Sequence, residues 1–283
     1  MTRSLFGFSV LVLTVSVSSS VFGQEPINGA DSATQPSPGH VIFKEQFRYL
    51  SLDLDENRRD RRGDIDDAVF LTTLGVGLQA DLSLSLRFPT VFRERELNDS
   101  NRTEREEGVG DVTSVLKWRV IRHDTSALDT FRLSLIGGAE VRTGDAPFTT
   151  DAYNPIFGLA FTKIAGRHGL NGSFNYTITT DGNDEPILPG ESKADLFRYD
   201  LAYLYRVSPK EYAADTHAAW YALCEVNGLY ETNGDHEVLI APGIMYEART
   251  WTAELSVQLP LWNDIEERAE LDYAIVTGIR FSW

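Results

Sequence analysis

Apolar and polar residues alternate at every second position along most of the chain, and this period of two is typical of β-strands rather than helices. In the last segment of the sequence, mostly apolar residues take the odd positions and small or charged residues take the even ones. The odd positions are Leu271, Tyr273, Ile275, Thr277, Ile279, Phe281 and Trp283. The same alternation predicts twelve strands, over residues 41–53, 67–79, 82–93, 109–121, 129–143, 154–165, 168–180, 194–207, 216–230, 236–248, 250–261 and 271–283.

The length of these strands and the pattern of their connections favour one fold class. The strands run over roughly 10 to 14 residues, whereas strands of globular proteins most often have about five or six. Long polar connections, such as 56–66, 94–108 and 181–193, lie at one rim, and mostly short turns lie at the other. This is the arrangement of bacterial outer-membrane barrels, in which an even strand number places both chain ends on the periplasmic side.

The sequence therefore predicts an all-β fold, an antiparallel transmembrane β-barrel of about twelve strands, preceded by a signal peptide. Two alternatives stay open. The strand number is ten or twelve, because the first segment alternates poorly, and a soluble secreted β-sandwich would show the same alternation.

The beginning of the chain divides into two short segments before the barrel. Residues 1–23 combine a basic start, an apolar run over 5–17 and small residues before position 24, which predicts a cleaved secretory signal peptide. Residues 24–40 are rich in Pro, Ser, Gly and Asn, which predicts a flexible linker. The alternative is that this linker enters the barrel lumen from the periplasmic side. The barrel itself is expected over 41–283.

Composition excludes several function classes. With 26 basic and 42 acidic residues the formal net charge is −16, which argues against nucleic-acid binding. The single cysteine, Cys224, excludes internal disulfides and iron–sulfur sites. No nucleophile elbow or phosphate loop occurs, and the five histidines lack metal-ligand spacing. We therefore expect no enzymatic activity, no metal and no cofactor.

A short motif resembles one family of barrels. Gly110 and Asp111 are followed, after five residues, by Lys117, Trp118 and Arg119. This stretch resembles the Gly-Asp, Lys-aromatic-Arg strand of the phenol-degradation meta-pathway transporter family of outer-membrane β-barrels. The resemblance implies a barrel linked to the uptake of aromatic or other hydrophobic compounds, and it brings no catalytic residues.

Charged residues within the strands are expected to face the lumen, because a charge facing lipid at the midplane costs about 2–4 kcal/mol. They either form interior salt bridges or contribute to solute passage, and because both signs occur we expect a narrow or plugged lumen. The lumen-lining candidates are Arg87, Asp111, Lys117, Arg119, Arg132, Glu140, Arg142, Arg198, Asp200, Arg206, Glu225, Glu237, Glu254 and Arg280.

The last strand resembles the signal that the barrel-assembly machinery recognises in outer-membrane barrels. It ends in an aromatic residue and has apolar side chains at alternate positions. The residues concerned are Tyr273, Ile279, Phe281 and Trp283. This machinery, outer-membrane lipid and a small hydrophobic solute are the expected partners, and the bacterial outer membrane is the expected location.

The sequence favours a passive channel or transporter for small hydrophobic or aromatic solutes. A structural or adhesive barrel with a closed lumen is the first alternative. The second is an envelope hydrolase, for which His236 at the loop rim is the candidate residue.

Overall fold

The structure is a computed structural model that describes residues 25–54, 63–97, 102–126, 128–184, 186–213 and 215–283. The expected signal peptide, residues 1–23, lies outside the described ranges. Within them, no helix has the length and apolar character needed to cross a membrane.

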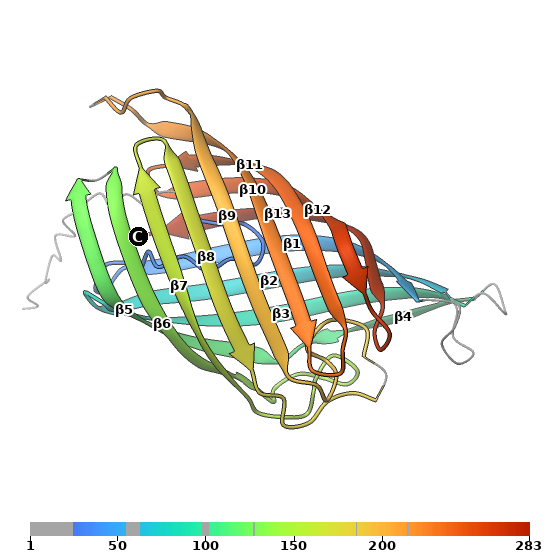
Figure 1. The fold of residues 1–283 in the computed structure, drawn as a ribbon. Coiled ribbons are helices and arrows are strands. Elements are labelled where there is room, and N and C mark those ends of the chain that lie inside the picture. Colours follow the sequence, from blue (N-terminus) through green and yellow to red (C-terminus); the bar gives the residue numbers. More distant parts are fainter. Residues whose placement is uncertain (1–24, 55–62, 98–101, 127, 185, 214) are drawn as a thin grey trace, which may run out of the picture.

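Antiparallel strands make up most of the described chain (Figure 1). They are β1 (Val41–Leu54), β2 (Gly63–Gln79), β3 (Leu82–Leu97), β4 (Arg102–Val109), β5 (Val112–Ser126), β6 (Asp129–Val141), β7 (Asn154–Ala165), β8 (His168–Thr177), β9 (Leu196–Ser208), β10 (Ala218–Glu231), β11 (His236–Ala248), β12 (Trp251–Asp264) and β13 (Glu270–Ser282).

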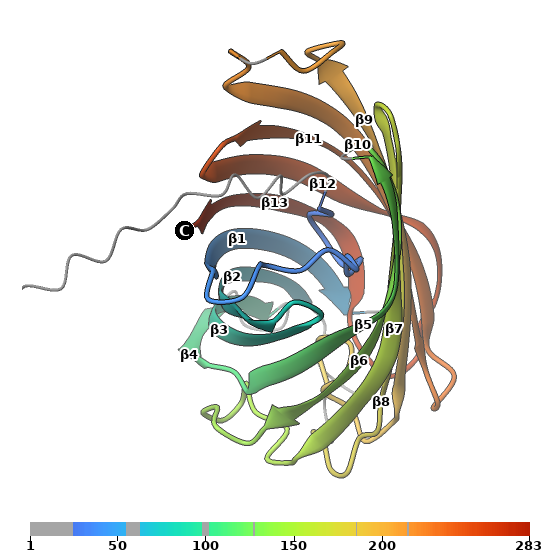
Figure 2. The same ribbon diagram turned by 90° about the vertical axis from the view of Figure 1, so that its left-hand side faces the viewer.

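Pairing of the first and last strands closes the sheet. β1 pairs with β13 from Ile42↔Ser282 to Asp53↔Glu270, and β2 joins β1 to β3. The remaining strands follow in chain order around the wall, with β4 paired to β3 alone. The result is a closed barrel of twelve strands plus the short extra strand β4, which confirms the predicted fold class and excludes the open sandwich. Figure 2 shows the wall curving around the blue N-terminal segment.

The predicted long loop over 94–108 is wrong in its extent, because β3 and β4 continue the wall as a hairpin. Their register runs from Thr90↔Val109 to Leu97↔Arg102, with an ion pair of 3.0 Å between Arg105 Nε and Glu94 Oε1. Apolar and polar residues do not alternate in this charged stretch, so the sequence pattern does not predict the strands there.

The strand predicted to begin at residue 109 instead breaks at Gly110 and Asp111. β4 and β5 pair with successive halves of β3, with these two residues between them. Gly110 N donates a hydrogen bond of 3.0 Å to Pro89 O, so the two strands stay in contact at the bulge. Such an extra residue bends a strand and redirects the side chains beside it.

The outer face of the wall is apolar and the inner face is polar, the reverse of a soluble protein. Trp118, Phe157 and Leu261 are 56%, 57% and 62% exposed, while Ser134 and Thr162 are fully buried. A lipid-facing outer wall and a polar interior are the pattern of transmembrane barrels.

Backbone pairing between β12 and β13 stops before the loop end of the barrel. β12 pairs with β13 from Trp251↔Phe281 only as far as Gln258↔Ala274. Beyond that point β12 continues along β11, where Pro260 lies opposite Leu239, and proline has no backbone N–H to donate.

The lipid-facing assignment predicts the effect of a charge on the outer wall. Leu135 lies in the middle of β6 and is 44% exposed. Leu135→Arg should lower the free energy of unfolding by about 2–4 kcal/mol, measured by urea titration in lipid vesicles. Tyr153→Arg, on an exposed loop, is the matched control and should change it little. Equal stabilities for the two variants would contradict a lipid-facing wall at Leu135.

Candidate functional site: the barrel lumen

Residues 25–40, here called the lumen segment, lie inside the barrel instead of forming an unpacked linker. The Glu225 carboxylate on β10 accepts hydrogen bonds from three successive backbone N–H groups of this segment. The distances are 2.6 Å from Ile27 N, 3.0 Å from Asn28 N and 3.3 Å from Gly29 N. The segment has no regular backbone ladder, so wall side chains satisfy its buried backbone groups.

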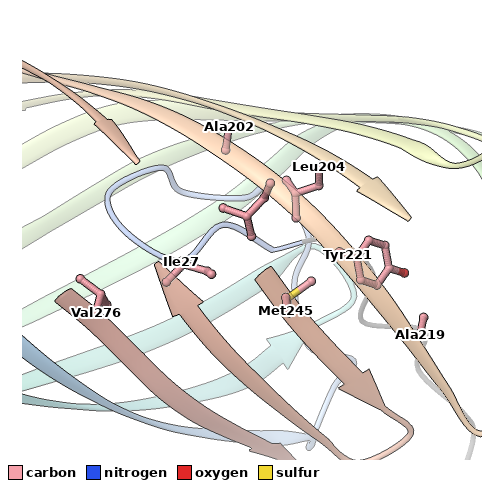
Figure 3. Packing of buried hydrophobic residues seen from close by; sticks show 8 residues of the cluster. Ile27, Ala202, Leu204, Ala219, Tyr221, Met245 and Val276 are labelled. Atoms are coloured by element: carbon pink, nitrogen blue, oxygen red, sulfur yellow. The ribbon is translucent and has the colours of Figure 1, made fainter. Parts of the chain in front are cut away.

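One apolar side chain of the lumen segment fixes its position further. Ile27 is 2% exposed and packs among residues of β9, β11 and β13, including Leu204, Met245 and Val276 (Figure 3). Small residues such as Ala202 leave room for it in the wall. The lumen therefore holds a local apolar core built around a single inserted isoleucine.

The rest of the segment runs past β8 and β7 toward the periplasmic end, where β1 starts and β13 ends. Asp31 N donates to Ser173 Oγ at 2.9 Å, and Ala33 N donates to Thr162 Oγ1 at 2.9 Å. The contact between Pro38 and Gly77 of β2 completes this path. Serine and threonine at inward positions thus act as hydrogen-bond acceptors for the segment.

The connection between β8 and β9 enters the lumen from the other end. Ile187 is 6% exposed and packs in a cluster that includes Leu52, Leu239 and Leu271. The Glu191 carboxylate accepts hydrogen bonds from Ile187 N at 2.8 Å and from the next amide at 3.0 Å. Burial raises the pKa of Glu191, although nearby Arg93 and these amides oppose the shift.

A cavity of about 490 Å³ lies between these two insertions and the wall. Ligand pockets commonly have about 300–1,000 Å³, so the cavity has the size of a site for a small molecule. Charged side chains line it beside apolar wall residues. The cations are Lys44, Arg48, Arg87, Lys117, Arg198 and Arg280, and the acids are Glu25, Asp31, Glu140 and Glu191.

Several of the residues predicted to line the lumen contact the lumen segment. Arg87 Nη2 lies 3.1 Å from Asp31 Oδ1, Lys117 Nζ donates to Ser32 O at 2.7 Å, and Arg280 forms an ion pair with Glu25. With Glu225, these four side chains bind the segment rather than one another. Arg198 and Glu140 line the cavity directly.

Three further predicted residues pair with side chains of the strands or of the connections between them. Glu254 lies 2.9 Å from Lys44 Nζ, Asp200 Oδ1 accepts from Asn227 Nδ2 at 2.8 Å, and Glu237 pairs with Arg268 at 3.1 Å. Arg206, also predicted, is buried with its guanidinium 3.9 Å from the centre of the Tyr212 ring.

Four predicted residues lie toward the ends of the barrel. Arg119 Nη2 pairs with Asp81 in the β2–β3 turn at 2.8 Å, Arg132 pairs with Asp124 at 3.1 Å, and Arg142 pairs with Asp151 at the loop end. The fourth, Asp111, organises a loop, as described below.

Asp111 holds the β6–β7 loop onto the bulge between β4 and β5. Its carboxylate accepts from the backbone N–H groups of Thr143, Gly144 and Thr150, each at 2.9 Å, and from the Thr149 hydroxyl at 2.8 Å. The Gly-Asp pair of the motif therefore anchors a loop.

Two important cationic residues were not anticipated from the sequence. Arg48 lines the cavity but lies in the poorly alternating first strand. Its inward direction could have been predicted from the polar residues at every second position, Lys44, Gln46 and Arg48. Arg93 makes a buried bidentate pair with Asp67, with both contacts at 2.7 Å. Asp67 lies directly opposite Arg93 in the β2–β3 hairpin, so the register of this hairpin was the available signal.

His236, the residue considered for a hydrolase, lies in an aromatic cluster. Its Nε2 is 2.7 Å from the Tyr199 hydroxyl, and its ring packs against Tyr230 and Trp262. Among the hydrogen bonds of the described residues, none links His236 to a serine. The hydrolase alternative therefore gains no support from this geometry.

Solved structures of outer-membrane proteins share this fold. An outer membrane channel of Pseudomonas putida F1 aligns with a TM-score of 0.62 and 13% identity, over 91% of this chain and 100% of that one. The β domain of the Bordetella autotransporter BrkA aligns with a TM-score of 0.52 and 10% identity, over 87% of this chain and 100% of that one. The fold and its polar, plugged lumen define the class: this is an outer-membrane β-barrel.

The family follows from the sequence itself. Residues 50–274 match the family described as "Putative MetA-pathway of phenol degradation", and the chain belongs to that family. This confirms the resemblance inferred from the stretch around Gly110 and Arg119. No curated protein matches the sequence.

The role of Asp111 in holding the loop is testable. Asp111→Ala removes the acceptor for the loop amides, so we expect faster amide hydrogen exchange over residues 143–150, measured by mass spectrometry. Asp151→Ala breaks an exposed ion pair of the same loop and serves as the control. If both variants exchange as slowly as the wild type, Asp111 does not anchor the loop.

Proposed function

We propose that the protein is a passive outer-membrane channel for small hydrophobic or aromatic solutes. The observation that carries the proposal is the lumen cavity of about 490 Å³, which is bounded by two inserted segments and not filled by a packed core. The family description supports an aromatic solute. The similar fold of the Pseudomonas putida outer membrane channel is consistent with passage through the barrel.

The lining of the cavity suits a small organic molecule with polar groups. Leu71, Ile136 and Ile156 contribute apolar surface, while arginine and lysine side chains contribute hydrogen-bond donors. Ligand sites commonly combine mainly apolar walls with a few directed polar groups. No energy source is needed, because the solute moves down its concentration gradient.

Passage requires the lumen segment to move, and its contacts permit this. Hydrogen bonds such as those to Ser173 and Thr162 exchange for bonds to water, so each contributes only about 0.5–1.5 kcal/mol net, and each bond to the Glu225 carboxylate contributes about 1.5–3 kcal/mol. The wall strands keep their own backbone pairs when the segment shifts. Beyond the Gln258↔Ala274 pair, β12 and β13 no longer pair with each other. This part of the wall offers a second route, from the lumen sideways between the two strands.

The alternative proposal is a closed barrel with a structural or adhesive role. The three amides bound by Glu225 and the burial of Ile27 favour it, because both hold the lumen shut. A permanently closed barrel carries no current, whereas a gated channel does, so conductance distinguishes the two.

The outward face of β13 supports a membrane setting. Tyr273, Ile279, Phe281 and Trp283 are 37%, 37%, 38% and 63% exposed, which fits contact with lipid. Recognition of this strand by the barrel-assembly machinery stays a prediction.

The channel proposal is tested by current through the purified protein in planar bilayers bathed in potassium chloride. We expect intermittent current that phenol, added to one side, partly blocks as it occupies the lumen. Glu225→Ala should raise the fraction of time spent open by about tenfold, because it removes an acceptor shared by three amides.

Glu104→Ala is the matched control for this variant. It removes a carboxylate from the exposed part of β4 and should leave the current unchanged. An absence of current from both the wild type and Glu225→Ala would contradict the channel proposal and favour the closed barrel.

A further inference from the structure

Three arginines and a lysine from four different strands converge on the lumen cavity. They are Arg48 on β1, Arg87 on β3, Lys117 on β5 and Arg198 on β9, and all four line the same space. Arg48 is repelled by Arg198 and Arg87 and attracted by the more distant carboxylates of Glu225 and Glu254. This group is here called the cationic cluster.

The cationic cluster has fewer acidic partners than charges. Asp31 Oδ1 of the lumen segment lies 3.1 Å from Arg87 Nη2 and 3.8 Å from Lys117 Nζ. Among the described residues, no carboxylate lies within 4.0 Å of a nitrogen of Arg48 or Arg198. Of the four cations, only Arg87 and Lys117 therefore have a carboxylate of the described chain within 4.0 Å, and they share the same one.

Arg48 shows most clearly that a partner is missing. It donates to two neutral acceptors, Asn28 O at 3.0 Å and Gln46 Oε1 at 3.1 Å. Its Nε is buried and has no hydrogen-bond partner. A buried charged group without a counter-ion is costly, and its persistence at the wall of a cavity points to a ligand that supplies the negative charge.

Two other acids near the cluster are already engaged. Asp200 binds Asn227 and Ser173, and Glu225 binds the backbone of the lumen segment. Asp31 is held by the cluster itself. Burial alone would raise the pKa of Asp31, but Arg87, Lys117 and Arg198 hold it below its usual range, so Asp31 is an anion at neutral pH.

From these contacts we infer that the cationic cluster binds the carboxylate of a small organic anion, and that Asp31 occupies part of this site as an internal carboxylate. The inference rests on the proposed function and deepens it by naming the solute class. Guanidinium groups present paired N–H donors that match the two oxygens of a carboxylate. Apolar lining from Leu71, Ile136 and Ile156 accepts the hydrocarbon part of the same molecule.

Binding of such an anion also affects the lumen segment. A carboxylate that takes the place of Asp31 beside Arg87 and Lys117 removes two of the contacts that hold the segment. The site thus couples occupation by solute to release of the segment, while Arg48 and Arg198 supply binding groups that Asp31 does not use.

The test is calorimetric titration of the full protein, in detergent at fixed low salt, with benzoate and with its neutral analogue benzamide. We expect benzoate to bind at least tenfold more tightly than benzamide. Arg198→Gln should weaken benzoate binding about tenfold and leave benzamide unchanged. Asp31→Asn removes the internal competitor and should tighten benzoate binding.

Arg142→Gln is the matched control, because Arg142 is an arginine outside the cavity, paired with Asp151 at the loop end. It should bind benzoate as the wild type does. Heat-modifiable gel mobility of each variant, compared before and after boiling, shows that the barrel has folded.

Two outcomes overturn the inference: equal affinity for benzoate and benzamide, or unchanged benzoate affinity in folded Arg198→Gln. Sodium chloride at the same concentration serves as a competitor, and complete loss of benzoate binding in it would assign the cluster to inorganic anions instead. If the protein binds benzoate but carries no current in bilayers, the carboxylate site is supported and only the channel proposal is contradicted.

Discussion

The whole structure depends on one constraint, that a wall in contact with lipid must satisfy its own backbone hydrogen bonds. Pairing of β1 with β13 meets this constraint by closing the sheet. Closure then fixes the two faces, because alternate side chains point outward to lipid and inward to the lumen. Exposed Trp118 and buried Thr162 are consequences of the same geometry.

Closure also creates a second requirement, since polar groups on the inner face need partners of their own. The lumen segment supplies many of them. Its amides bind Glu225, Ser173 and Thr162, and its Asp31 binds Arg87. Because water or a solute offers the same hydrogen bonds, the inner face has alternative partners that the wall does not have. The proposed movement of the lumen segment would therefore leave the backbone pairs of the wall intact.

Charge is distributed unevenly between the chain and its lumen. The formal net charge of the chain is −16, yet six cations and four acids line the cavity. The charged lining of the cavity is therefore net positive, although the chain as a whole is acidic. The overall charge of the chain therefore does not describe the binding site.

The sequence predicted most of the wall, because apolar and polar residues alternate wherever one face of a strand contacts lipid and the other faces the lumen. It failed over β4, where Arg and Glu occupy both faces above the membrane, and at Arg48, where outward Glu45 interrupts the alternation. The inward direction of Glu225 and Arg198 was predictable, but their partners were not, since the Pro- and Gly-rich composition of 24–40 fits a linker equally well. Contacts between residues 28 and 225 depend on the closed fold and leave no local pattern.

The central claim is that the lumen segment controls passage, and a reversible cross-link tests it most directly. Ser32 Oγ lies 3.1 Å from Thr162 Oγ1, so Ser32→Cys with Thr162→Cys, in a Cys224→Ser background, should form a disulfide between the segment and β7. The account predicts that the oxidised protein carries no current in a bilayer and that a reducing agent restores it. Equal currents before and after reduction, with the cross-link confirmed by mass spectrometry, would contradict the account.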